Sequence, residues 1–295
     1  MMKMTEVPTT KANKIGRWFA ARLETRIDRL WLVAVMLCAS SVHAQDELPD
    51  IVTDERTGVR IVFYDFSKHE NDMKSRWRNG VVEVVPAKRK NRHYYKRYAK
   101  RALKQYPLEL IKKYLRTLYI VEEIKLIFGS LSIEPEGIYD LERGAIYLTT
   151  GGARYDSQLN TEDIFHHEFS SFLLHGYAYL FPKAEWLALN PSDFQYDIGH
   201  TDDGDSPFVP EDGEFYFQRC LPGPHAMTSW ENDINTFAMQ LFWARATLVG
   251  VRERPLPFDD YPCLQKKLDL LAAFYRRIHP MFTAEYFANE QITNN

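Results

Sequence analysis

The sequence of 295 residues contains no hydrophobic run long enough to cross a bilayer. Its most apolar stretch, Leu30 to Ala39, falls well short of the ~20 residues that a spanning helix needs. There is no internal repeat and no low-complexity segment. Positive charge is not in excess, because 37 Lys and Arg stand against 40 Asp and Glu. Nucleic acid is therefore not an expected partner.

The first 44 residues have the pattern of a signal peptide. Basic residues precede the apolar run: Arg22, Arg26 and Arg29. Val42-His43-Ala44 then provides a small-x-small cleavage site before Gln45. We therefore expect an exported protein, periplasmic or extracellular, whose mature part is one domain of residues 45–295 with no transmembrane span. A retained N-terminal anchor is the alternative.

Cysteine is scarce, with three residues in the whole chain. Cys38 lies inside the predicted signal peptide and would be lost on cleavage, which leaves Cys220 and Cys263. In an oxidising compartment, an even pair of cysteines predicts one disulfide.

Hydrophobic patterning predicts an α+β fold. Alternating β-branched and aromatic residues indicate strands at 58–66, 119–128 and 144–150. Apolar residues at helical spacing indicate helices at 94–118, 161–180, 229–249 and 262–278. Thr161, followed by acidic residues that suit the positive end of the dipole, is the expected start of the second helix. Residues 139–144 resemble a turn, and residues 183–227 form a long acidic loop of the kind that is often functional.

Two charged segments allow more than one interpretation. The helix at 94–118 has a basic outer side, which is either a solvated face or a surface for anionic lipid or lipopolysaccharide. In the acidic loop, Asp202-Asp-Gly-Asp205 suggests a calcium site, but it lacks the alternating ligands and distal Glu of an EF-hand.

The stretch that points to chemistry is His167-Glu168-Phe-Ser-Ser171. A zinc-peptidase helix carries H-E-x-x-H because residues four apart share one face, so two imidazoles grip the metal while the Glu activates a water. Here the fifth position is Ser171. His175 is no substitute, because eight residues place it about 12 Å along the axis from His167.

The string Ile164-Phe-His-His-Glu-Phe-Ser-Ser-Phe-Leu173, with Trp186, Asn190-Pro191 and the segment 226–238, resembles the zinc-binding metallopeptidase family of the bacterial envelope. The similarity covers roughly residues 120–245. It implies a zincin-like, gluzincin-type fold, in which a small sheet packs on the active-site helix and further helices follow toward the C-terminus.

The resemblance also implies zinc as cofactor and a role for particular residues. His167 would be the first ligand, Glu168 the general base, and Glu231 or Asp233 the acidic ligand. His166 is a further metal candidate, although adjacent helix positions point about 100° apart. A water, His225 or His200 would have to complete the coordination. The resemblance departs from the family at Ser171.

Each of these residues also has a purely structural explanation. Glu231 follows Thr228 by three positions, as in a capping box, and Asp233 could complement the dipole of the same helix. His166 and His175 could be hydrogen-bonded, partly buried histidines. The pair His167-Glu168 is harder to explain in this way, because it lies among phenylalanines and needs partners if it is buried.

Two functions are compatible with this pattern. The first is an exported zinc-dependent peptidase or related hydrolase with a degenerate metal site, acting on a peptide or protein. The second is a catalytically inactive binding or scaffold protein of the cell envelope that kept the peptidase fold, because a fold does not by itself imply a function.

Overall fold

The computed structural model describes residues 50–63, 81–128, 130–150, 157–196, 213–246 and 256–289, all of which lie in the unit Leu48–Asn295. The predicted signal peptide, His200 and Asp202–Asp205 fall outside the described residues. Within the described part of the chain, no helix combines the length and the apolar character that a membrane span requires.

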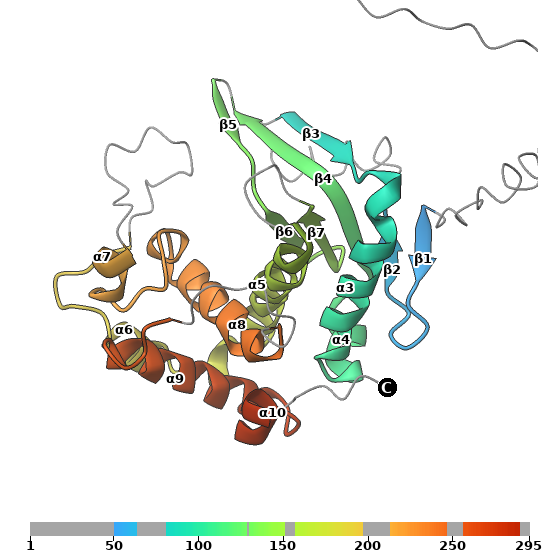
Figure 1. Cartoon of the computed structure of the whole chain (residues 1–295). Helices are drawn as coiled ribbons and strands as arrows, with labels where there is room; N and C mark the ends of the chain where they lie inside the picture. The colour runs from blue at the N-terminus through green and yellow to red at the C-terminus, as the bar shows by residue number, and fades with distance from the viewer. Residues whose placement is uncertain are drawn as a thin grey trace, which may run out of the picture. The chain divides into compact units, whose positions relative to one another are not determined.

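A mixed sheet forms one layer of this unit (Figure 1). Its strands run in the order β1 (Ile51–Thr53), β2 (Arg60–Val62), β4 (Thr117–Phe128), β7 (Ala145–Thr149) and β6 (Gly137–Asp140). The three middle strands are parallel, and the two outer ones pair antiparallel with their neighbours. Two further strands, β3 (Val81–Pro86) and β5 (Leu131–Ile133), pair antiparallel with β4.

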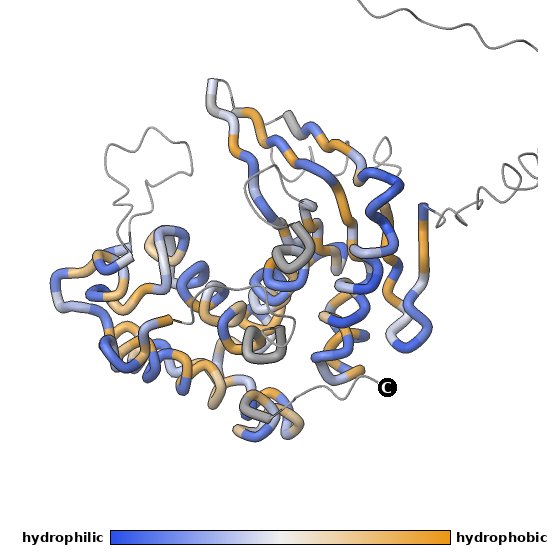
Figure 2. Tube along the Cα trace, viewed as in Figure 1, coloured by the Kyte–Doolittle hydropathy of each residue, from blue (hydrophilic) through white to orange (hydrophobic). Residues whose placement is uncertain are grey.

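The long strand β4 shows how the sequence builds the sheet. Successive side chains of a strand point to opposite faces, so alternate residues separate into two sets. Leu118 and Ile120 join the large core that the helices also enter, whereas Tyr119 and Val121 belong to a second apolar cluster on the other face. On that second face the ring of Tyr119 stacks on Tyr147 at 4.5 Å. Figure 2 shows the resulting mixture of apolar and polar positions along the strands.

Helices cover one face of the sheet and continue beyond it. They are α3 (Arg92–Lys104), α4 (Leu108–Tyr114), α5 (Ser157–Tyr177), α6 (Lys183–Leu187), α7 (Gly213–Phe217), α8 (Trp230–Ala246), α9 (Pro262–Ile278) and α10 (Ala284–Asn289). Short 3₁₀ turns are η1 (Arg89–Asn91), η2 (Ala178–Leu180) and η3 (His225–Met227). Helix α5 is central, because it packs against β6, β7, α3 and α8 (Figure 1). The predicted α+β fold, a sheet packed on the helix of His167 with further C-terminal helices, is confirmed.

The single helix predicted at 94–118 is wrong. The chain forms α3 and α4 with a break at Pro107, and residues from Thr117 onward already belong to β4. Proline has no N–H to donate and clashes with the preceding turn, so it can begin a helix but not continue one. Pro107 accordingly occupies the N-cap position of α4, where its carbonyl accepts from the backbone N–H of Leu110 and Ile111.

The turn predicted at 139–144 is partly wrong. Tyr139 and Asp140 belong to β6, which pairs with β7, and the turn itself is confined to residues 141–144. It ends at Gly144, whose φ of 61° is readily accessible only to glycine. A hypothetical Cβ there would also meet the carbonyl oxygen of Tyr114.

Two other boundaries differ from prediction. Helix α5 begins at Ser157, one turn before Thr161, so Glu162 does not lie at the helix start. Its carboxylate is instead bound by Arg101 and Gln105 of the α3 region. The predicted loop at 183–227 contains the helices α6 and α7 and the turn η3.

The predicted disulfide is confirmed. Cys220 and Cys263 are joined, with their Cα atoms 5.6 Å apart. The bond links the segment that precedes η3 to the first turn of α9.

Candidate functional site

Polar side chains are buried around the whole circumference of α5. Every residue from 161 to 174 is buried. The polar ones are Thr161, Glu162, Asp163, His166, His167, Glu168, Ser170 and Ser171. A buried polar group costs free energy unless it is hydrogen-bonded, so the partners of these side chains show what the helix is built to hold.

His166 lies in the aromatic core. Its Nδ1 is 3.0 Å from the hydroxyl of Tyr106, and its ring stacks on Phe242 with centroids 4.3 Å apart. The structure therefore places His166 among core aromatic residues and does not bring it together with the other predicted site residues.

His167 points toward η3. Its ring lies 5.1 Å from the ring of His225, measured between centroids. Burial, with a smaller contribution from His225, lowers the pKa of His167 to about 3. The imidazole is therefore neutral at physiological pH, which is the form in which histidine binds metals.

Ser171, one helical turn after His167, holds a carboxylate from α8. Its Oγ donates to Glu231 Oε1 at 2.8 Å and accepts from Asn235 Nδ2 at 2.8 Å. The hydroxyl of Tyr139 on β6 donates to the same Glu231 oxygen at 2.8 Å. These bonds connect α5, α8 and the edge strand β6 through one carboxylate oxygen.

Glu231 lies beside position 171, at which the zincin pattern has its second histidine. A serine side chain is much shorter than a histidine side chain. The Glu231 carboxylate can therefore approach α5 closely at this position, with Oε1 2.8 Å from Ser171 Oγ. His175 adjoins the outer end of this cluster, with Nε2 3.6 Å from Glu231 Oε1 and 3.3 Å from Tyr139 OH.

Glu168 packs against the edge strand. A Cβ on Gly137 of β6 would overlap Glu168 Oε1 and Ile164 Cγ2, so only glycine permits this approach of strand and helix. The side chain of Glu168, the candidate general base, therefore lies against the backbone of β6.

Asp233 lies in a separate buried cluster. Its Oδ2 accepts from Lys267 Nζ at 2.6 Å, Trp186 Nε1 at 2.9 Å and Tyr196 OH at 2.7 Å. Burial raises the pKa of the Asp233 carboxyl, while the Lys267 ammonium opposes that shift. Burial lowers the pKa of Lys267. Of the two predicted acidic candidates, the structure brings Glu231 to the His167 helix and engages Asp233 elsewhere.

N-terminal capping of α8 does not explain why residue 231 is a glutamate. The start of α8 is capped by Ser229, whose Oγ accepts from the backbone N–H of Asn232 at 3.0 Å. Thr228 donates to the His225 carbonyl instead. The capping box of Thr228 and Glu231 is therefore wrong, and the Glu231 side chain turns toward α5.

The described donor set does not fit a zincin metal centre. Among the residues that the structure describes, no three His, Cys, Asp or Glu side chains are grouped so that they could hold a metal ion. A structural zinc site needs four ligands, and a catalytic one needs three from the protein. His167 and His225 form a pair, but Glu231 is engaged by Ser171 and Tyr139.

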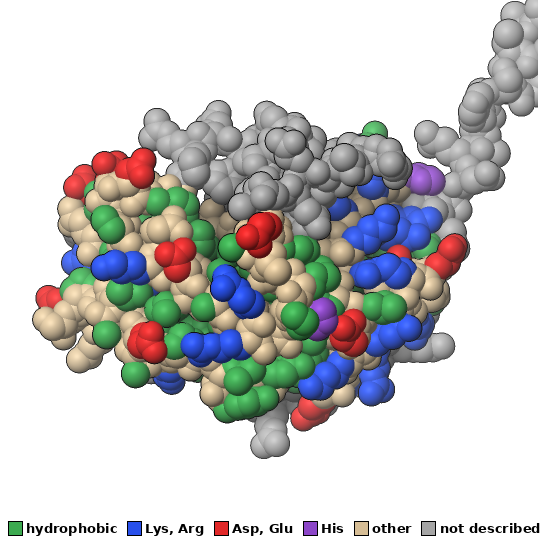
Figure 3. All heavy atoms as spheres, turned by 90° about the horizontal axis from the view of Figure 1, so that it is seen from below, with side chains coloured by type: hydrophobic (Ala, Val, Ile, Leu, Met, Phe, Trp, Pro, Cys, Tyr) green, Lys and Arg blue, Asp and Glu red, His purple; other side chains and the backbone are tan. Residues whose placement is uncertain are grey.

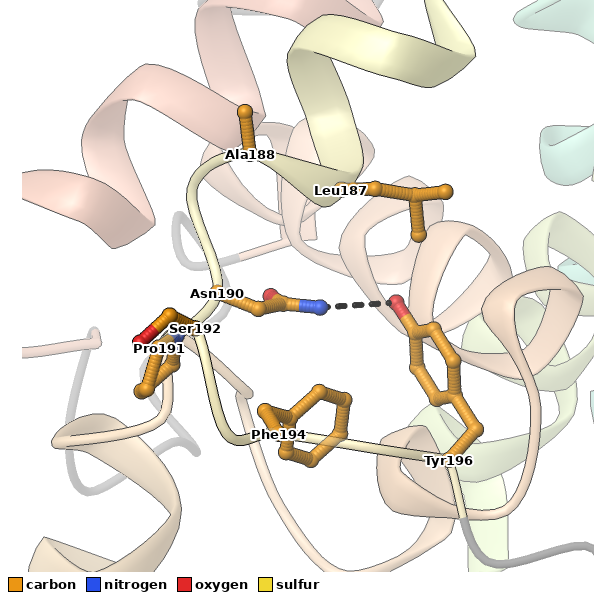
Figure 4. A pocket seen from close by; sticks show the side chains of 7 residues that line it. All are labelled: Leu187, Ala188, Asn190, Pro191, Ser192, Phe194 and Tyr196. Carbon is orange, nitrogen blue, oxygen red and sulfur yellow. Dashed lines mark hydrogen bonds between the residues drawn. The ribbon is translucent and has the colours of Figure 1, made fainter.

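A cavity of about 550 Å³ lies on the Asp233 side of this region (Figure 4). It is lined by Leu187, Ala188, Asn190, Pro191, Ser192, Phe194 and Tyr196. Asn190 Nδ2 donates to Tyr196 OH at 3.3 Å (Figure 4), and that hydroxyl in turn donates to Asp233. None of the predicted site residues lines the cavity.

Sequence reasoning missed three residues that organise the two clusters: Tyr139, Asn235 and Lys267. Only Lys267 left a signal, because it lies three residues after Leu264 and four before Leu271, on the apolar stripe of α9. A lysine at such a position needs a buried acidic partner. Tyr139 and Asn235 reach the site through contacts with distant parts of the chain.

Comparison with protein families and with curated proteins finds no match. Among solved structures, the chain is similar to a crystal structure from Bacteroides caccae described as a "putative zinc-binding metallo-peptidase". The TM-score is 0.37 and the identity 11%, over 72% of this chain and 88% of that one.

The buried, neutral His167 predicts a loss of stability in acid. Below its ordinary pKa of about 6.5 the unfolded imidazole binds a proton, whereas the folded one stays neutral down to about pH 3, so stability falls as pH falls through this window. Between pH 6.5 and 5 the loss is about 1.7 kcal/mol. Urea unfolding should show this loss in the wild type and not in His167→Asn. As a control, His93→Asn at the exposed His93 should show the same dependence of the free energy of unfolding on pH as the wild type. If His167→Asn also keeps the wild-type dependence, the prediction is contradicted.

Proposed function

We propose that the chain is an exported, zinc-peptidase-related protein that has lost zinc-dependent hydrolysis and acts by binding a peptide or protein partner in the cell envelope. The observation that carries the proposal is the hydrogen bond from Ser171 to Glu231. Together with the bond from Tyr139, it gives Glu231 Oε1 two hydroxyl donors from within the protein, so this oxygen is satisfied without a metal.

The relation to zinc peptidases is supported by how the helices meet. Ser171 follows His167 by four residues, so both lie on one face of α5. Glu231, from a helix sixty residues later, reaches that same face. An acidic side chain from a later helix, hydrogen-bonded to the residue at the fifth position of the zincin pattern, agrees with the arrangement that the sequence resemblance implies. The change at Ser171 removes a ligand and leaves this arrangement in place.

A binding role has a specific surface available. Among the described strands, β6 is one of the two terminal strands of the order β1-β2-β4-β7-β6, and it contacts Glu168 and Glu231. An exposed sheet edge can accept an extended peptide as an additional strand, with affinity supplied by main-chain hydrogen bonds. The partner that fits this surface is an extended peptide or a strand of another envelope protein.

A second candidate function is a hydrolase with a reduced metal site. It is favoured by the contact between His167 and His225, since a second imidazole from η3 could stand in for the one absent at position 171. The neutral state of His167 suits this role.

The zinc content of the purified protein separates the two functions. After dialysis against zinc, elemental analysis should find far less than one zinc per chain, and His167→Ala should change nothing. About one zinc per chain, as a catalytic site requires, would instead support the hydrolase. That zinc should then be lost in His167→Ala and His225→Ala and retained in the control His175→Ala.

A second variant tests the relation to zinc peptidases independently of the lost activity. Ser171→His restores the pair of imidazoles four residues apart, next to Glu231. If the surrounding framework is that of a zincin, this variant should bind zinc more tightly than the wild type. No gain of zinc in a folded Ser171→His protein would contradict the relation.

A further inference from the structure

Positive charge is concentrated in one segment of this acidic chain. Residues 84–108 contain nine Lys and Arg and no Asp or Glu, although the whole chain has a net charge of −3. The nine are Lys88, Arg89, Lys90, Arg92, Lys96, Arg97, Lys100, Arg101 and Lys104. They occupy η1, α3 and the residue before them.

Part of this charge is neutralised within the protein. Arg92 pairs with Asp50 and Arg101 with Glu162, and Lys88 pairs with Glu122 at 2.5 Å. Lys100 lies 3.9 Å from Asp54. The remaining charge is not balanced in this way: within the described chain, no ion pair involves Lys90, Lys96, Arg97 or Lys104.

Three of these four residues, Lys90, Arg97 and Lys104, share one face of η1 and α3. Positions 90, 94, 97, 101 and 104 are separated alternately by four and three residues, which is the spacing of a single helical stripe. Lys90, Arg97 and Lys104 are exposed, and Tyr94 between them is 46% exposed. Lys and Arg side chains gather on the side of the molecule where α3 and α4 lie (Figure 3).

The opposite face of α3 is already used in the core. Tyr95, Ala99, Ala102 and Leu103 are buried and belong to the main apolar cluster. The helix therefore cannot insert an apolar face into lipid without unfolding the domain. Any contact through α3 must be made by the basic stripe, at the surface of the partner.

We propose that the outer face of η1 and α3 binds the surface of an anionic phospholipid bilayer. The stripe spreads its charges over about 18 Å of helix and lies apart from the cavity lined by residues 187–196, which matches a broad surface of phosphate groups better than a compact ligand. The exposed Tyr94 has the amphipathic ring that favours the membrane interface. Nucleic acid would be repelled by the rest of the acidic chain.

Vesicle sedimentation of the full chain tests the proposal. The wild type should bind vesicles of phosphatidylcholine and phosphatidylglycerol at low salt, and release them at high salt because the attraction is screened. It should bind pure phosphatidylcholine vesicles at least tenfold more weakly. The variant Lys90→Gln/Arg97→Gln/Lys104→Gln should lose at least tenfold in affinity for the anionic vesicles.

A variant matched in charge controls for net charge and for any lipid contact elsewhere. Lys266→Gln/Arg276→Gln/Arg277→Gln removes three exposed charges from α9 and should bind like the wild type. Equal binding by the α3 variant and the wild type would overturn the proposal, and so would equal loss in both variants. Absence of vesicle binding by the wild type would also overturn it and would leave an acidic protein as the partner of this face. Thermal unfolding of both variants should stay close to that of the wild type, because all six side chains are exposed and the hydrogen bond from Arg277 to the Leu180 carbonyl is itself exposed.

Discussion

Lys267→Met should destabilise the protein by about 3–5 kcal/mol, because it leaves the Asp233 carboxylate buried without its countercharge. Both side chains of this ion pair are 0% exposed. Methionine has nearly the length of lysine, so the volume in the core is preserved and little of the loss comes from packing. Trp186 Nε1 and Tyr196 OH still donate to Asp233, but they carry no positive charge to offset its desolvation. Urea unfolding measures the change.

The double variant Asp233→Asn/Lys267→Met separates the buried charge from the lost contact. An asparagine oxygen can still accept from Trp186 and Tyr196, and no charge remains in the core. The double variant should therefore recover most of the stability lost in Lys267→Met, since replacing both members of a buried pair is often nearly neutral. A loss below about 1 kcal/mol in Lys267→Met would show that the pair behaves like an exposed one.

The elements with strong periodicity could be predicted from the sequence. Strands β4 and β7 and helices α5, α8 and α9 follow from local patterns that tertiary packing did not override. Strand β6 was missed because residues 139–144 look locally like a turn, and what makes Tyr139 extended is its pairing with Ile146 of β7. The break at Pro107 had a local cause in the sequence, since proline cannot continue a helix.

The candidate site was predictable only in part. Glu231 and Asp233 are two residues apart on α8, so they point to different sides and cannot both face α5. The sequence therefore required a choice between them but gave no basis for making it. The structure brings Glu231 to Ser171, and Lys267 from α9 takes Asp233. Both outcomes depend on how helices distant in sequence pack, which no local pattern encodes.

Removing the disulfide should cost about 4 kcal/mol in the chain-entropy model, because the bond closes a loop with a sequence separation of 43 residues. That loop contains α8, which supplies Glu231, Asp233 and Asn235. Without the bond, the unfolded chain gains conformational freedom. The variant Cys220→Ala/Cys263→Ala removes the bond without leaving a buried thiol, as reduction would, or a buried hydroxyl, as serine would. Its urea midpoint should lie well below that of the oxidised wild type.

Reduction of the wild type provides the matched comparison for this variant. Unfolding in the presence of a strong reductant should lower the wild-type midpoint to that of Cys220→Ala/Cys263→Ala, and the variant itself should not respond to the reductant. Cys220 has a φ of 60°, a conformation that costs alanine as well as cysteine, so the two reduced states should agree. Mass analysis should find both cysteines protected from alkylation until the protein is reduced. If both are alkylated without reduction and the midpoint is insensitive to reductant, the bond does not stabilise the protein, and α8 is held in place by its packing on α5 and α9 alone.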